Sequence, residues 1–259
     1  MDSARIVELL EPYLGPASDQ PLTTSDIRHI STYIDILQRW NSRINLTAIR
    51  NQEEIVARHF GESLFAARSL FPVRSSMSAA PGRANAACDR REAASSERDR
   101  ERAALEGPRS GAAMSGPFSP AVADIGSGAG FPGIPLKLWA PFIHLTLIES
   151  NYKKSTFLRE VARALTLTDI NIQTARAEAL KEKKEKFDVA TLRAVERFES
   201  ILPTAAGLVA PAGRLALLIG AAQILEARSA LPTMAWSDPT PIPQSQSRVL
   251  LIGTQGLQL

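Results

Sequence analysis

The fold assignment begins with the stretch AVADIGSGAGFPGIPLKL, residues 121–138. Its first residues include apolar and β-branched side chains, as a buried parallel strand requires, and its last residues begin a helix. Between them stand Gly126, Gly128 and Gly130, and glycines at alternate positions let the backbone adopt positive φ and approach a ligand closely. A strand, a glycine-rich turn and a helix N-terminus in this order predict a nucleotide-type binding site.

This glycine motif has two registers. The dinucleotide fingerprint G-x-G-x-x-G fits residues 128–133, but it would carry the strand through Gly126 and Ser127, which are poor strand residues. The better register ends the strand at Ile125 and begins the turn with the next glycine. Asp124 then stands at the strand end, where an acid suits a ligand that carries an ammonium group. S-adenosylmethionine carries such a group and NAD does not, so this register favours S-adenosylmethionine.

Strand and helix patterns alternate from residue 120 onward, which predicts an α/β fold of parallel βαβ units with helices on both faces of the sheet. Two further strands are expected in MAWSDP and SRVLLIGT, near the end of the chain. The earlier strands are predicted at 120–125, 143–148, 169–174, 187–192 and 213–219, and the helices at 132–139, 151–165 and 197–209.

Candidate ligand contacts follow the ends of the predicted strands. Glu149 ends the second strand, where a carboxylate can accept both hydroxyls of a ribose; otherwise it caps the next helix. Ala177 and Glu178 lie beyond the third strand, where an adenine ring would stack, although RAE is also an ordinary helical sequence. Arg193 ends the fourth strand and suits the carboxylate of a methionine group or a substrate phosphate, with a rim salt bridge as the alternative.

Composition divides the chain into three parts. Residues 1–72 predict an N-terminal helical extension, with a first helix broken at Pro12 and a second capped by Thr24 or Ser25. Residues 73–119 form a low-complexity insertion, rich in Ala, Ser, Arg and Glu, which is expected to be disordered because it has too little apolar area to bury. Residues 120–259 form the predicted ligand-binding core.

Bulk properties exclude several classes of protein. The chain of 259 residues is 44% hydrophobic and carries a formal net charge of +3, so it permits contact with nucleic acid without requiring it. The single cysteine, Cys88, cannot form an internal disulfide and suits a reducing cytoplasm. The sequence shows no signal peptide and no run long enough to span a bilayer, and no histidine at metal-ligand spacing. We therefore expect a soluble cytoplasmic protein without a metal site or a membrane partner.

Four motifs together resemble one family. DIGSGAGFPGIPL, LIESNYKKSTFLREV, ARAEAL and FDVATLRAV are similar to the RsmG family, also called glucose-inhibited division protein B. The N-terminal run WNSRINLTAIRNQEEIVARHFGES resembles the stretch that precedes the methyltransferase core in that family. The resemblance implies a Rossmann-like fold that transfers a methyl group from S-adenosylmethionine to N7 of a guanine in 16S rRNA. The expected partner is 16S rRNA or the small ribosomal subunit, and the expected state is a monomer.

The resemblance also implies roles for particular residues. It implies that seven residues contact the cofactor. They lie in the glycine turn, at the ribose-binding acid, beside the adenosine and at the end of the fourth strand: Gly126, Gly128, Phe131, Glu149, Ala177, Glu178 and Arg193. Asn45, Arg58 and His59 match the N-terminal motif that faces the methyl donor. No catalytic residue is assigned, because the N7 lone pair of guanine needs no general base.

The chain departs from the family pattern at three places. The insertion replaces a short turn, Gly61-Glu62-Ser63 stands where an aspartate usually precedes the serine, and Ile219-Gly220 replaces a usual lysine–glycine pair. A lost lysine near the rim would weaken RNA contact. Two alternatives therefore stay open: a methyltransferase with a small-molecule substrate, and an RNA-binding scaffold whose active site has decayed.

Overall fold

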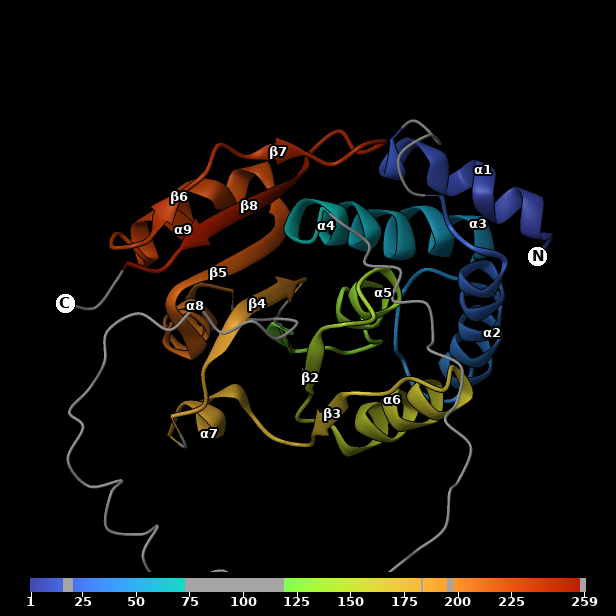
Figure 1. The fold of residues 1–259 in the computed structure, drawn as a ribbon, viewed down its shortest axis with the longest axis horizontal. Helices are drawn as coiled ribbons and strands as arrows, with labels where there is room; N and C mark the ends of the chain where they lie inside the picture. The colour runs from blue at the N-terminus through green and yellow to red at the C-terminus, as the bar shows by residue number, and fades with distance from the viewer. Residues whose placement is uncertain (16–20, 73–118, 183, 195–197, 257–259) are drawn as a thin grey trace, which may run out of the picture. The chain divides into compact units, whose positions relative to one another are not determined.

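A mixed sheet forms the centre of the fold in the computed structural model, which describes residues 1–15, 21–72, 119–182, 184–194 and 198–256. The strand order is β3-β2-β1-β4-β5-β8-β6, and β7 pairs with β8 off this path (Figure 1). The first five strands pair in parallel, whereas β8 is antiparallel to its neighbours β5, β6 and β7. The strands are β1 (Ala121–Ile125), β2 (His144–Ile148), β3 (Ile170–Gln173), β4 (Phe187–Arg193), β5 (Val209–Gly220), β6 (Ala235–Trp236), β7 (Thr240–Pro241) and β8 (Arg248–Thr254).

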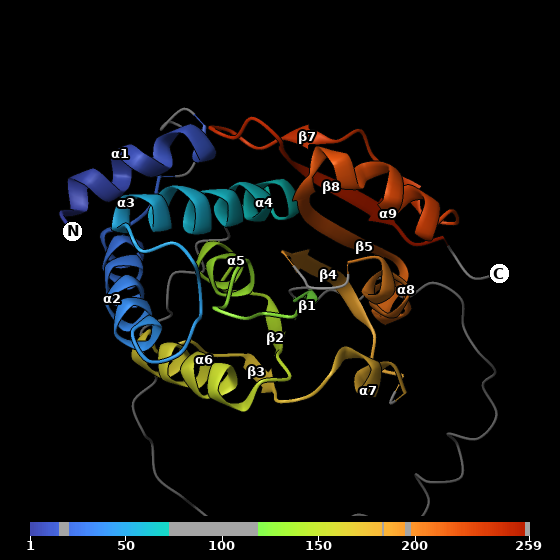
Figure 2. The same ribbon diagram turned by 180° about the vertical axis from the view of Figure 1, so that it is seen from behind.

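Helices cover both faces of this sheet, because the strands are apolar on both sides. One hydrophobic cluster joins the sheet to α5 (Gly133–Trp139), α6 (Tyr152–Ala164) and the N-terminal helices. A second cluster lies on the opposite face (Figures 1 and 2). It is formed with α7 (Ala177–Glu182), α8 (Phe198–Leu208) and α9 (Ile224–Ala230), and a short 3-10 turn, η4 (Ala221–Gln223), precedes α9.

The predicted α/β fold is confirmed, and the first four core strands lie within one residue of their expected ends. The pattern of the sequence does not predict α7 or α9, which are only six and seven residues long. The fifth strand begins at Val209 rather than 213, because Val209 already pairs with Phe187 of β4. Ala212, in the left-handed region at a φ of 60°, lies within the register shift before Arg214 pairs with Val189. The predicted insertion, apart from Ser119, lies outside the described residues.

The N-terminal segment is helical, as expected, but two details differ from the prediction. Pro12 does not end the first helix; it lies inside it, and the helix continues to Leu14. The buried ring of Tyr13 explains this continuation, because the ring packs directly on Gly61. A Cβ added to Gly61 would lie 2.5 Å from the Tyr13 ring. The helices are α1 (Ser3–Leu14), α2 (Thr24–Asn41), α3 (Gln52–Glu54), the π-helix η1 (Ile55–Gly61) and α4 (Glu62–Leu70).

The second difference is the residue that caps α2. The cap is Thr23, not Thr24 or Ser25. The Thr23 side chain accepts a hydrogen bond from the backbone N–H of Asp26 at 3.2 Å, and the Asp26 carboxylate accepts one from the backbone N–H of Thr23 at 2.7 Å. This reciprocal capping box satisfies two helix-end donors at once, which favours Thr23 over its neighbours.

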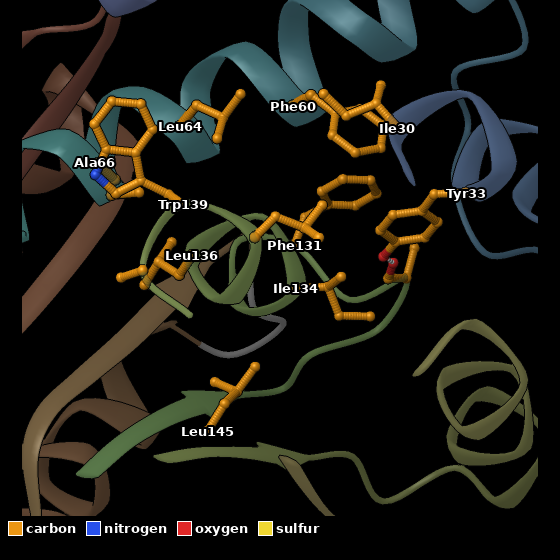
Figure 3. Packing of buried hydrophobic residues seen from close by; sticks show 14 of the residues in the cluster. Ile30, Tyr33, Phe60, Leu64, Ala66, Phe131, Ile134, Leu136, Trp139 and Leu145 are labelled. Carbon is orange, nitrogen blue, oxygen red and sulfur yellow. Dashed lines mark hydrogen bonds between the residues drawn. The ribbon is translucent and has the colours of Figure 1, made fainter. Parts of the chain in front are cut away.

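The N-terminal helices attach to the core through the residue that follows the glycine turn. The Phe131 ring lies parallel to Tyr33 at 5.2 Å and edge-on to Phe60 at 5.1 Å (Figure 3). The Tyr33 hydroxyl donates to the carbonyl of Ala129, inside the turn itself. The Trp139 indole donates to the carbonyl of Phe71 at 2.9 Å. The N-terminal helices and the turn therefore share one packed interior.

We expect Gly133→Ala to destabilise the protein by about 1–3 kcal/mol through overpacking. A Cβ at Gly133 would lie 2.5 Å from Leu147 Cδ2 and 2.7 Å from Asp124 Oδ2. The free energy of unfolding in urea measures the effect. Gly256→Ala is the matched control, because a Cβ there meets no atom of the described chain within 4 Å. Equal stabilities of the two variants would contradict the close packing at the start of α5.

Candidate functional site

The glycine turn has the register favoured by the sequence. Strand β1 ends at Ile125, and Gly126, Gly128 and Gly130 have φ values of 70°, 55° and 84°. The N–H of Gly126 donates to the carbonyl of Ile148 at 2.9 Å, which holds the turn against the end of β2. Around Gly128 there is space, since within 4 Å a Cβ would meet only the carbonyl oxygen of Gly126, at 3.8 Å. The turn therefore presents open backbone at this glycine.

Glu149 is brought directly to the turn. Its carboxylate accepts from the N–H of Gly128 at 2.9 Å and from the N–H of Asn151 at 2.7 Å, and the residue is 6% exposed. The side chain of Asn151 in turn caps α6 by accepting from the N–H groups of Lys153 and Lys154. One carboxylate thus links the end of β2, the glycine turn and the start of the next helix.

Asp124 lies beneath the turn, not on its open side. One carboxylate oxygen accepts from the N–H of Gly133 at 3.2 Å, the other accepts from the Thr191 hydroxyl at 2.9 Å, and the residue is 1% exposed. The carboxylate therefore contacts donors of the protein itself, and the expected ammonium group near this acid stays a prediction. Its side chain points from β1 into the interior, between the first turn of α5 and β4.

Burial has an electrostatic consequence for Asp124. Removal from water raises the pKa of this carboxyl to about 6, and the hydrogen bonds from Thr191 and Gly133 oppose that rise. The residue therefore titrates at mildly acidic pH while it holds the turn in place.

The two residues that are expected beside the adenosine differ in exposure. Ala177, at the start of α7, is 5% exposed and belongs to the same hydrophobic cluster as Ile125 and Ile148, at the ends of β1 and β2. Glu178, the next residue, is exposed. The structure thus brings Ala177 to the edge of the sheet that carries the glycine turn, and it shows no contact between Glu178 and the other candidates.

Arg193 is buried at the end of β4 beneath the N-terminal helices. Its Nη2 donates to the carbonyl of Arg58 at 2.7 Å and to Glu62 Oε2 at 3.0 Å, and its side chain is 6% exposed. The guanidinium of Arg248, on β8, places its Nε 3.1 Å from the same oxygen of Glu62. Arg193 therefore forms an ion pair, as in the alternative interpretation, but the pair is buried rather than at the rim, and a second arginine shares it.

His59 lies in the π-helix η1, between this ion cluster and the glycine turn. Its ring stacks on Phe131 at 4.8 Å, and its Nε2 lies 2.8 Å from the hydroxyl of Thr47. Burial, together with the positive charges of Arg193 and its two neighbouring arginines, lowers the pKa of His59 to about 3. The imidazole is consequently neutral at physiological pH. The Phe131 ring itself is 7% exposed, so its side chain serves the interior.

Several residues that shape the site carry no local sequence signal. In the sequence Glu62 is a departure from the family pattern, yet its carboxylate occupies the centre of the ion cluster. Tyr33, Thr191 and Arg248 gain their roles from partners far away in the chain. Of these residues only Glu62 has any signal in the sequence, because it is a charged residue inside an apolar helical pattern.

We expect Asp124→Asn to change how stability depends on pH. Because the folded-state pKa of Asp124 lies above the ordinary value of 3.8, the folded protein binds more protons than the unfolded chain between about pH 4 and pH 6. This group therefore makes the free energy of unfolding fall as pH rises through that window. The stability of Asp124→Asn relative to wild type should rise by about 2–3 kcal/mol from pH 4 to pH 7.

Urea unfolding of both proteins at several pH values measures this difference. His59 contributes with the opposite sign, since its lowered pKa makes stability rise with pH between about 3 and 6.5, but that contribution is common to both proteins and cancels. Asp238→Asn, at an exposed position outside the turn, is the control. If the difference in the free energy of unfolding between the two proteins stays constant from pH 4 to pH 7, the buried carboxyl of Asp124 is not the source of the pH dependence.

Comparison with known proteins identifies the family to which this site belongs. The family described as rRNA small subunit methyltransferase G, GidB, matches residues 26–77 and 111–242. A ribosomal RNA small subunit methyltransferase G from Roseiflexus castenholzii is 31% identical over 241 residues, covering 89% of this chain and 84% of that protein. The protein of the same name from Halorhodospira halophila is 33% identical over 194 residues, covering 75% and 69% of the two chains. The match to the Mycoplasma capricolum protein of the same name is shorter, with 50% identity over 99 residues, covering 38% and 43% of the two chains. The chain therefore belongs to the rRNA small subunit methyltransferase G family.

Proposed function

We propose that this protein transfers a methyl group from S-adenosylmethionine to N7 of a guanine in 16S rRNA of the small ribosomal subunit. The observation that carries the proposal is the glycine turn held by Glu149, inside a chain whose family match covers both the N-terminal helices and the core. The relatives that match most of the chain carry the name ribosomal RNA small subunit methyltransferase G.

The residues of the site fit the methyl donor. The turn offers open backbone at Gly128, and Glu149 lies against it, where a ribose would find an acceptor. Ala177 provides a small side chain at the same edge for the adenine ring. At the other end, three buried nitrogens have no hydrogen-bond partner among the described residues: Arg193 Nε, His59 Nδ1 and Arg248 Nε. A carboxylate such as that of the donor's amino acid group would satisfy such buried polar atoms.

The methyl transfer requires the protein to position the two reactants, and it requires no proton transfer before the attack. S-adenosylmethionine supplies an electrophilic methyl group on a sulfonium, and guanine N7 carries a free lone pair at neutral pH. The protein therefore has to align the two reactants and exclude water. A neutral His59 agrees with this requirement, because it adds no further positive charge beside a base that becomes cationic on methylation.

An RNA substrate is supported by basic residues on the N-terminal helices, in the turn after α2 and on α6. Arg43 and Lys153 are exposed, whereas Arg39 and Arg58 are engaged in ion pairs with Glu160 and Glu54 at 2.6 Å and 2.8 Å. Exposed cations of this kind bind RNA phosphates without reading the sequence. Action on 16S rRNA implies a cytoplasmic protein, and we propose that it acts as a monomer.

Within the described residues, none of the helices has the length and apolar character needed to cross a bilayer.

Two measurements test the proposed function. Isothermal titration with S-adenosylmethionine should show binding by the wild-type chain. Small ribosomal subunits that lack the modification should then gain N7-methylguanosine in 16S rRNA, as detected by mass spectrometry after nuclease digestion. Binding of the donor without rRNA methylation would favour the small-molecule alternative, and absence of donor binding would favour the decayed scaffold.

Glu149→Gln should weaken binding of S-adenosylmethionine by roughly tenfold or more, because hydrogen bonds to a charged partner contribute about 1.5–3 kcal/mol. The loss has two sources: the carboxylate holds Gly128 in place, and it is the expected acceptor for the ribose hydroxyls. Glu199→Gln, at an exposed position of α8, is the matched control. An unchanged dissociation constant in Glu149→Gln would remove this residue from the binding site.

A further inference from the structure

The cluster around Glu62 holds an excess of positive charge that is mostly buried, with the Arg248 side chain 21% exposed. A single carboxylate oxygen, Oε2, lies 3.0 Å from Arg193 Nη2 and 3.1 Å from Arg248 Nε, and the Glu62 side chain is 2% exposed. Two cations thus share one anion. Buried charges are costly unless they are compensated, so this arrangement is suited to a further negative group.

Unpartnered polar atoms point to the same conclusion. Among the described residues, Arg193 Nε, His59 Nδ1 and Arg248 Nε are buried without a hydrogen-bond partner, although Arg248 Nε lies within ion-pair distance of Glu62. The Thr47 hydroxyl accepts from the N–H of Ile49 at 3.2 Å and lies 2.8 Å from His59 Nε2, and no other acceptor for its proton is described. When that hydroxyl donates to Nε2, the neutral imidazole carries its own proton on Nδ1. His59 and Arg193 then both offer N–H groups to an acceptor.

Arg248 is set apart from these two residues by its position. It lies at the start of β8 opposite Gly220 of β5, and its Nη2 is 3.5 Å from the carbonyl of Leu218. Its closest charged partner is Glu62. Among the described residues, Arg248 is linked to Arg193 through Glu62, and its charge also acts on His59, which stacks on Phe131 of the turn.

We propose that Arg248 is a positioning residue for the methyl donor. Because Arg248 shares the Glu62 carboxylate, the three side chains together keep a net positive charge. Arg193 Nε then remains available to the donor's carboxylate. This inference rests on the proposed function, since it takes S-adenosylmethionine as the ligand. Without Arg248, Glu62 and Arg193 form a balanced pair, and a carboxylate ligand loses the excess positive charge that attracts it.

A purely structural role for Arg248 makes a different prediction. An ion pair that only fastens β8 to α4 would, when removed, weaken the fold and every ligand alike. A positioning role affects only ligands that carry the carboxylate. Two probes separate the roles: S-adenosylhomocysteine has the amino acid group, and 5′-methylthioadenosine has the same nucleoside and a thioether without that group.

The test is isothermal titration of both probes against the full-length chain. We expect wild type to bind S-adenosylhomocysteine more tightly than 5′-methylthioadenosine. Arg248→Met should weaken the first by about tenfold, as expected if the charge-assisted contact between Arg193 and the carboxylate of the probe is lost, and should change the second by less than about twofold. Arg248→Lys should restore most of the preference, because it restores the cation. Arg228→Met removes an exposed arginine of α9, whose described hydrogen bond is to the carbonyl of Ser237, and should leave both affinities unchanged.

Each result has one meaning. If wild type binds neither probe, the proposed function fails. If wild type binds both and Arg248→Met keeps the full preference for S-adenosylhomocysteine, the positioning role is overturned while the proposed function stands. Equal weakening of both probes in Arg248→Met also overturns it, since that is the signature of a structural residue. A selective loss that lysine restores supports the proposal.

Discussion

Two buried carboxylates accept hydrogen bonds from the backbone of the glycine turn, and the arrangement of the site depends on them. Asp124 holds the N–H of Gly133 from below, and Glu149 holds the N–H of Gly128 from the end of the neighbouring strand. A glycine-rich turn has high conformational freedom when unfolded, so a fixed shape requires such partners. The raised pKa of Asp124 shows that burying this acid is unfavourable in itself, and the hydrogen bonds that it accepts offset the cost. A turn organised before the ligand arrives binds with a smaller loss of entropy.

The N-terminal helices complete the site from the opposite side. Tyr33 bonds to the turn at Ala129, and the π-helix η1 brings His59 onto Phe131. Immediately after this π-helix, Glu62 reaches Arg193 at the end of β4. Such π-helical turns are frequent at functional sites, because the extra residue changes the direction of the side chains that follow. The helices are therefore part of the ligand-binding structure as well as of the hydrophobic interior.

Two departures from the family pattern have a structural explanation. Glu62 retains a carboxylate at the place where an aspartate is usual, and it makes the ion pairs described above. Ile219, in place of the usual lysine, is 4% exposed and packs in the cluster formed with α7, α8 and α9. Its side chain thus serves the apolar interior on the face opposite the Glu62 cluster. Neither departure disturbs the turn.

The sequence by itself determined what depends on local pattern. The register of the glycine turn, the parallel strands and the place of Glu149 at a strand end follow from apolar periodicity and from the backbone freedom of glycine. Only the tertiary structure decided where the charged side chains point. Asp124 turned inward to Gly133 and Thr191, and Arg193 paired with a carboxylate 131 residues earlier in the chain. The physical reason is that an ion pair or a buried hydrogen bond depends on which segments the fold brings together, and no spacing within one segment contains that information.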